Sequence, residues 1–246
     1  MRRQGSADNP DSWLQERRFF RTRSVSRNRR FLAQPLLVAL GLWFAADSPA
    51  IASASPPGWS TLSGKTVGAG QTAILGQLGW PGFSATLLHG VAPTMDLGGR
   101  LTFNYGEEGI VTQVVPGIRL QGVARLTFFD NGKLNFGMQF EPGPVVYFTS
   151  FQTTVGLVLP VGLRLGVPLS DAFLLSFGVE APVFRIFGSS GGWIFPVLFG
   201  AGLEYFVAPN LAATLNGRAG PSVDTRGFRP VSDLALEALF GVAYRF

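Results

Sequence analysis

The sequence contains no cysteine and a single histidine, His89, among its 246 residues. The absence of cysteine excludes a disulfide framework and any thiolate metal site. His89 lies in phase with Phe83, Ala85 and Leu87 of an alternating stretch, where an interfacial structural role is favoured over catalysis. No cluster of His and carboxylate residues has metal-ligand spacing, and no glycine-rich motif of the nucleotide-binding type opens a helix. We therefore predict a protein that is not an enzyme and needs no cofactor.

The sequence also has little that could cross a membrane as a helix. The apolar run Leu36–Ala46 is shorter than the roughly 20 residues that a transmembrane helix needs. Arginines precede this run and small residues follow it, which is the three-part pattern of a secretory signal peptide. We expect residues 1–54 to be a basic extension plus signal peptide, cleaved after Ala54 or, as the second choice, after Ala52.

The net charge of +5 comes from the first part of the chain. Residues 1–30 carry nine Arg against three acidic residues, whereas residues 55–246 carry eleven basic and eleven acidic residues. A protein that binds nucleic acid would place an excess of basic residues on its folded body. The neutral body, which we expect to be one domain over residues 55–246, argues against nucleic acid as a partner.

From residue 66 onward, apolar and polar positions alternate with a period of two, which is typical of β-strands. We count ten candidate strands, which are Thr66–Leu75, Phe83–Gly90, Asp96–Tyr105, Val115–Phe128, Lys133–Tyr147, Thr153–Val167, Ala172–Phe184, Trp193–Phe206, Leu211–Gly220 and Ser232–Phe246. The predicted fold class is all-β, an antiparallel barrel of about ten strands, with eight strands as the alternative.

Large apolar residues occupy one face of these strands, and charged residues share the other face with many glycines. In a soluble barrel the apolar face would be interior, where so many Phe and Leu side chains would overfill the space. In a transmembrane barrel the apolar face meets lipid and the charges and glycines line the lumen, so we place the apolar face outward. Aromatic residues would then form two girdles, Phe128, Phe173, Tyr205 and Phe246 at one end and Phe83, Tyr105, Tyr147 and Trp193 at the other.

The connections alternate between short turns, such as Phe129–Gly132, and longer links, such as Gly106–Val114. Membrane barrels show this pattern, with short periplasmic turns and long extracellular loops. Two glycine-containing segments, Gly76–Gly82 and Gly188–Gly192, would be surface loops, where barrels of this kind bind their ligands; their composition indicates a flexible loop more strongly than a binding site for a surface ligand, which the sequence does not identify.

The last candidate strand has one wholly apolar face that ends in two aromatic residues. Its ending, Gly241, Tyr244 and Phe246, resembles the C-terminal assembly signal of bacterial outer-membrane β-barrel proteins. That signal has a polar residue, a glycine and two alternating large apolar positions that end in Phe; here Leu239 stands at the polar position. The resemblance implies a place in the outer membrane of a Gram-negative cell, reached through the periplasm, with outer-membrane lipid and the barrel-assembly machinery as partners.

The outward assignment of the apolar face directs a set of charged residues into the lumen. They are Arg100, Arg119, Arg125, Lys133, Glu141, Arg164, Glu180, Glu204, Arg218, Glu237 and Arg245. One interpretation is a paired ionic network that fills a narrow barrel, because buried charges persist when they are paired. The other is a charged constriction that selects solutes. We favour the filled interior, because barrels of about eight strands are filled by their own side chains.

We therefore predict an integral outer-membrane barrel of structural or surface-interaction type with a narrow charged lumen. The first alternative is a porin-like channel for small solutes, for which the luminal glycines would leave room. The second is a soluble β-barrel that binds a ligand, which would need no detergent to stay in solution.

Overall fold

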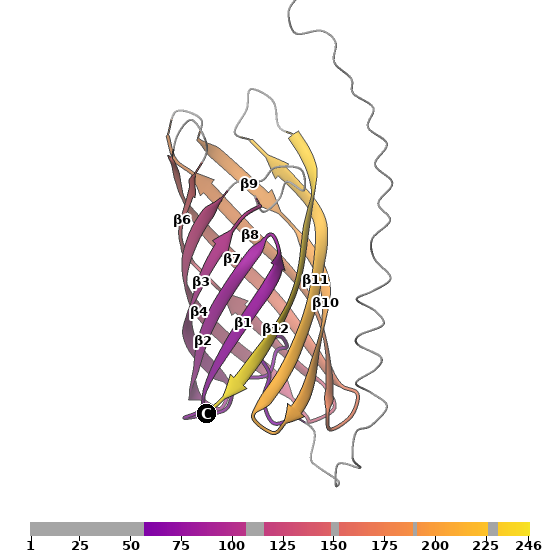
Figure 1. Ribbon diagram of the computed structural model, residues 1–246. Coiled ribbons are helices and arrows are strands. Elements are labelled where there is room, and N and C mark those ends of the chain that lie inside the picture. The colour runs from indigo at the N-terminus through magenta and orange to yellow at the C-terminus, as the bar shows by residue number, and fades with distance from the viewer. Residues whose placement is uncertain (1–56, 107–115, 149–152, 189–190, 226–230) are drawn as a thin grey trace, which may run out of the picture. The chain divides into compact units, whose positions relative to one another are not determined.

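A computed structural model describes residues 57–106, 116–148, 153–188, 191–225 and 231–246. The predicted signal peptide and its cleavage positions, Ala52 and Ala54, lie outside these residues. The described residues form twelve strands and no helix (Figure 1). The strands are β1 (Thr72–Trp80), β2 (Gly82–Ala92), β3 (Met95–Asn104), β4 (Gly117–Asp130), β5 (Asn135–Phe140), β6 (Gly143–Phe148), β7 (Thr153–Pro168), β8 (Phe173–Ile186), β9 (Gly192–Pro196), β10 (Leu198–Ala208), β11 (Leu211–Asp224) and β12 (Val231–Arg245).

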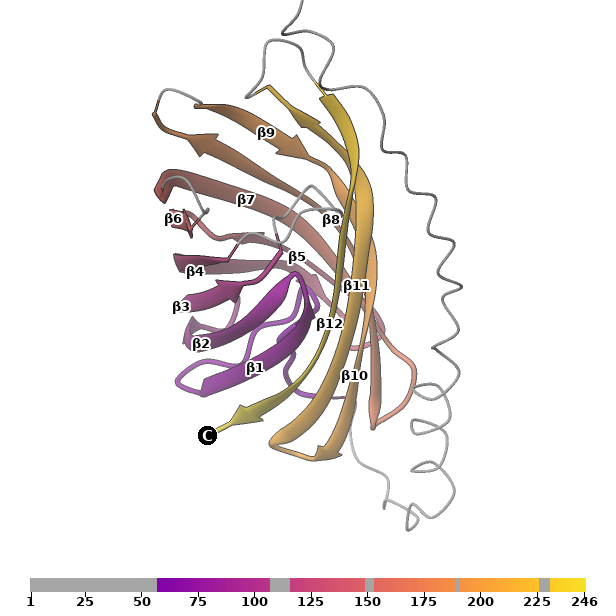
Figure 2. The same cartoon turned by 45° about the horizontal axis from the view of Figure 1, so that its top comes forward.

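The strands form one antiparallel sheet that closes when β1 pairs with β12 (Figure 2). β5 and β6 lie end to end between β4 and β7, and β9 and β10 lie end to end between β8 and β11. The breaks fall at Glu141 and Pro142, between β5 and β6, and at Val197, between β9 and β10. The ring therefore has ten positions, and the predicted all-β antiparallel barrel of about ten strands is confirmed.

The two ends of the barrel differ in their connections. We call the end with the links β2–β3, β4–β5, β7–β8 and β10–β11 the turn end, and the opposite end the loop end. The C-terminal residue Phe246 exchanges backbone hydrogen bonds with Thr72 at the turn end (Figure 1). The wall is thus sealed by the first and last strands of the described chain.

Side chains alternate between the two faces of the wall, as the period of two predicts. Most large apolar residues of the strands are exposed on the outer face. Leu120, Phe199 and Phe240, for example, are 57–60% exposed. The inward face carries buried polar side chains, for example those of Thr86 and Gln121. The barrel therefore has an apolar outside and a largely polar inside.

The prediction of a first strand over Thr66–Leu75 is wrong, because β1 begins at Thr72 and continues to Trp80. Gly68 and Gly70 have φ angles of 101° and 72°, in the left-handed region, so they bend the chain where an extended strand was predicted. The predicted surface loop Gly76–Gly82 is also wrong. Most of that segment belongs to β1, and only Pro81 lies between β1 and β2.

Aromatic side chains lie at both ends of the outer face. Exposed ones are Phe128, Phe173 and Phe246 at the turn end, and Phe83 and Trp193 at the loop end; Tyr205 and Tyr105 are half-buried. Tyr147, which was predicted for the loop-end girdle, is buried inside the barrel instead. The reason is the alternation of side chains along the wall. Tyr147 is an even number of residues after Gln139 and Glu141, which precede it between β4 and β7, so it faces inward as they do.

Candidate functional site in the barrel interior

The structure places most of the charged residues predicted for the lumen on the inward face of the strands. These are Arg100, Arg119, Arg125, Glu141, Arg164, Glu180, Glu204, Arg218, Glu237 and Arg245. Lys133 differs, because β5 begins at Asn135 and Lys133 lies in the exposed turn before it. The inward residues do not form one cluster. They divide between two levels of the interior, and a third level at the loop end is apolar.

Residues 57–71, which precede β1, fill the turn end of the interior, and we call this segment the plug (Figure 1). Its Trp59 and Val67 are almost completely buried and pack in an apolar cluster with inward residues of the wall. The Trp59 ring meets Phe206 edge-on, with ring centroids 5.4 Å apart, and its Nε1 donates to the carbonyl of Pro209 at 2.9 Å. The plug is therefore packed against the wall as a protein core is packed.

Arg125 of β4 is the main cation that holds the plug. Its guanidinium donates to the plug carbonyls of Ser60, at 3.1 Å, and Ser63, at 2.9 Å, and also to that of Lys65. It lies 3.5 Å from the carboxylate of Asp96, which in turn accepts from the N–H of Val67. One buried arginine thus replaces the backbone partners that this irregular segment lacks.

Glu204 of β10 holds the other side of the plug. Its carboxylate accepts from the hydroxyl of Ser60, and from the N–H and hydroxyl of Thr61, both at 2.8 Å. Because the Glu204 side chain is completely buried, these three donors are what replace its hydration. Arg125 and Glu204 therefore clamp the plug between opposite charges.

The wall and the plug approach each other closely at Gly64. A Cβ atom on Gly64 would stand 2.6 Å from the carbonyl carbon of Phe136 and 2.8 Å from the carbonyl oxygen of Arg164. The hydroxyl of Thr127 donates to the Gly64 carbonyl at 2.6 Å. Only glycine fits this position, and Gly137 on the facing wall is limited in the same way by the plug.

A second level, which we call the ionic layer, crosses the middle of the barrel. Its salt bridges are Arg100–Glu141 at 2.7 Å, Arg164–Glu180, Arg218–Glu180 and Arg218–Glu237. Amide side chains extend it, since Gln139 donates to Glu141 and Asn216 donates to Glu237 at 3.2 Å. Arg119 also contributes to this level, where it interacts electrostatically with Glu180. The layer links β3, β4, β5, β7, β8, β11 and β12 across the lumen.

On the side formed by β6–β9, the loop end of the interior carries a third, apolar level, whereas buried polar residues such as Asn104 and Ser222 lie on the other side. The apolar level consists of Val145, Tyr147, Val158, Phe184, Ile186 and Ile194, all of them at most 3% exposed. These residues lie on the inward face of β6, β7, β8 and β9, where an aqueous pore would need polar side chains. The interior therefore holds the plug at one end, ion pairs in the middle and, at the other end, an apolar cluster along β6–β9.

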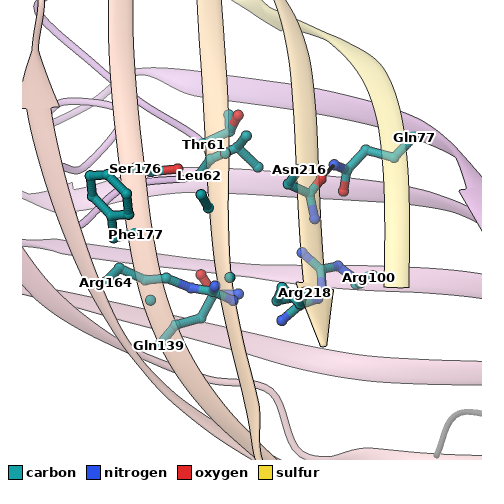
Figure 3. A pocket seen from close by; sticks show the side chains of 14 residues that line it. Thr61, Leu62, Gln77, Arg100, Gln139, Arg164, Ser176, Phe177, Asn216 and Arg218 are labelled. Carbon is teal, nitrogen blue, oxygen red and sulfur yellow. Dashed lines mark hydrogen bonds between the residues drawn. The ribbon is translucent and has the colours of Figure 1, made fainter. Parts of the chain in front are cut away.

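Three cavities inside the barrel, each lined by described residues, are small. One of about 30 Å³ lies between the plug and the ionic layer, with Thr61 and Leu62 of the plug on one side and arginines of the layer on the other (Figure 3). Two more, of about 20 Å³ each, border Arg100 and Arg218. A cavity of roughly 10–15 Å³ is enough for one water molecule, so these spaces suit isolated waters. A wider hollow of about 360 Å³ lies at the turn end, beside Lys65 and Asp130.

The plug was not predicted, although a signal for it exists in the sequence. Residues 57–65 include Trp59 but show no apolar alternation and are rich in Ser, Thr and Gly. Such a segment, which lies outside the strand pattern, has no hydrogen-bonding partner in a neighbouring strand, so it must find one elsewhere. Its contacts join residues far apart in the chain, which a reading of local patterns does not reveal.

No family model and no curated protein matches the chain. In the described ranges no helix is long and apolar enough to span a membrane. Nor do His, Asp and Glu side chains group there in a way that would hold a metal ion.

Proposed function

We propose that the chain is an integral barrel of a Gram-negative outer membrane, with a structural or surface-interaction role and a closed interior. The observation that carries the proposal is the outer face of the wall. Large apolar side chains cover it, for example Phe83 at 50%, Leu120 at 58% and Phe240 at 57% exposure. Monomeric soluble proteins rarely expose apolar patches of more than a few hundred Å².

The placement of charge supports a membrane as the surroundings of this face. The arginines and glutamates of the strands lie mostly inside, whereas the wall of a soluble barrel would carry them outside. The aromatic residues at both ends of the outer face match the girdles at the two interfaces of a bilayer. The C-terminal ending at Gly241, Tyr244 and Phe246 supports the outer membrane in particular.

The filled interior favours a structural or surface-interaction role over transport. The plug and the ionic layer lie across the lumen, the apolar level lines one side of its loop end, and the three small cavities suit single waters. A protein of this kind would act through its outer face or its loops.

A small-solute channel is the second candidate. It is favoured because the contacts that hold the plug in the lumen are non-covalent. If the plug left the lumen, the ionic layer would stand behind an open turn end, and its arginines and glutamates would select ions. The apolar level at the loop end would still have to open. This candidate therefore needs two rearrangements, whereas the closed barrel needs none.

The experiment is to fold residues 55–246 in detergent, reconstitute them in a planar bilayer and record currents. A heat-modifiable band on electrophoresis together with a silent bilayer is expected for a closed membrane barrel. Discrete openings would replace this proposal by the channel. A monodisperse protein that stays in solution without detergent would overturn the membrane assignment itself.

A further inference from the structure

Arg185 breaks the rule that the strands of this barrel direct their charges inward. It is the next-to-last residue of β8, and its neighbours Phe184 and Ile186 both point into the apolar level of the interior. Alternation therefore turns Arg185 outward. Among the Lys and Arg residues of the described segments, it is the one that a strand directs to the outer face.

The surroundings of Arg185 are aromatic and aliphatic. Its guanidinium lies over the ring of Trp193, 5.1 Å from the centroid, and Trp193 stacks on Phe195. On the other side, Arg185 pairs in register with Leu157 of β7, which is 43% exposed. No carboxylate of the described residues forms a salt bridge with it.

At a membrane, a cation in these surroundings would lie at the boundary between the acyl chains and the headgroups. Its apolar neighbours would contact acyl chains, and its position near the strand end lets the guanidinium reach the headgroup region. Arginine binds phosphate through a planar fork of donors while it stacks on an aromatic ring. The side chain thus presents a phosphate ligand at the level where lipid phosphates lie.

We propose that Arg185, Trp193 and Phe195 form a binding site for the phosphate-bearing headgroup of an anionic lipid in the leaflet at the loop end. Arg185 binds the phosphate, and the two aromatic rings line the path of the lipid's upper acyl chain. The site rests on the proposed function, because it requires the outer face to meet a bilayer.

Native mass spectrometry of the full chain, isolated from membranes in a non-ionic detergent, tests the site. Phosphatidylglycerol and phosphatidylcholine with identical acyl chains are titrated separately, and the affinity of the first bound lipid is compared. A basic side chain near an anionic surface should favour phosphatidylglycerol by about fivefold. Arg185→Gln should remove this preference, and Trp193→Leu should reduce it.

Lys133→Gln is the matched control, because it also removes one positive charge, from an exposed position at the turn end. It should leave the preference largely intact. An equal loss in Arg185→Gln and Lys133→Gln would show that net charge alone attracts the lipid, and would overturn the site. Displacement of phosphatidylglycerol by an equal concentration of inorganic phosphate would also overturn it, because the site would then take a soluble anion.

The two proposals fail in different ways. Equal binding of both lipids by the native chain would remove the Arg185 site and leave the membrane barrel standing. A chain that binds neither lipid and remains soluble without detergent would remove the proposed function as well.

Discussion

Replacement of Arg125 by leucine should release the plug without unfolding the wall. Arg125 donates to the carbonyls of Ser60, Ser63 and Lys65, and it is the salt-bridge partner of Asp96. In Arg125→Leu those plug carbonyls lose their donor, and Asp96 keeps a buried charge without its cation. Both effects disfavour the seated plug.

The size of the effect follows from the burial of the pair, since Arg125 and Asp96 are 4% and 0% exposed. Removal of one partner from a buried ion pair costs about 3–5 kcal/mol. Every 1.4 kcal/mol changes an equilibrium tenfold, so the ratio of released to seated plug should rise by roughly two to three and a half orders of magnitude.

A cysteine introduced at Ser63 reports on the plug, because the chain has no other cysteine. Ser63 is 1% exposed, so a soluble maleimide should label Ser63→Cys slowly in the folded barrel. Addition of Arg125→Leu should accelerate labelling strongly, under conditions in which the protein still shows its folded, heat-modifiable band.

Arg218→Leu serves as the control for this experiment, because it breaks buried salt bridges to Glu180 and Glu237 in the ionic layer, where Arg218 faces the plug across a small cavity and its hydrogen bonds go to those two glutamates instead. It should destabilise the barrel yet leave the labelling of Ser63→Cys slow. An unchanged rate in Arg125→Leu, or equal acceleration by both variants, would refute the assignment of Arg125 as the residue that holds the plug.

Three further predictions concern the plug, the ionic layer and the chain end. Gly64→Leu should accelerate labelling of Ser63→Cys, because its Cβ would clash with the wall; Gly58→Leu is its control, since a Cβ there meets nothing within 4 Å, and similar rates would contradict the close packing. Arg218→Leu should lower the unfolding free energy by about 3–5 kcal/mol, measured by urea titration of the folded band; an unchanged midpoint would mean that the salt bridges contribute nothing. Phe246→Ser should lower the yield of membrane-inserted barrel in a Gram-negative host, and a normal yield would argue against the resemblance to the assembly signal.

Much of the wall could be predicted because alternation is a local property. Each strand shows which of its faces is apolar without reference to its neighbours, as in β4, where Leu120 is exposed and Gln121 is buried. The breaks beside Pro142 and Pro196 were not predicted, because the apolar pattern continues across them in the same phase. Tyr147 was misplaced because its residue type suits an interface, while its phase directs it inward.

The interior could be predicted only in part. Alternation indicates which charges point inward, but it does not indicate their partners, since Arg218 reaches Glu180 from 38 residues away. The plug escaped prediction because its hydrogen bonds span still longer separations, 143 residues for Thr61 and Glu204. Gly68 and Gly70 of the plug fit the alternating pattern of a strand in the sequence, although their positive φ angles bend the chain in the structure.

The position of the plug has a consequence for the order in which the barrel is completed. The plug precedes β1 in the chain, yet the last strand, β12, closes the wall beside it. Arg245 of β12 stacks over Trp59 and donates to the carbonyl of Val67 at 3.3 Å, so the strand that seals the seam also touches the segment inside. Completion of the wall and filling of the lumen are thereby coupled at one residue, and a chain with a misplaced plug would close its seam without these contacts.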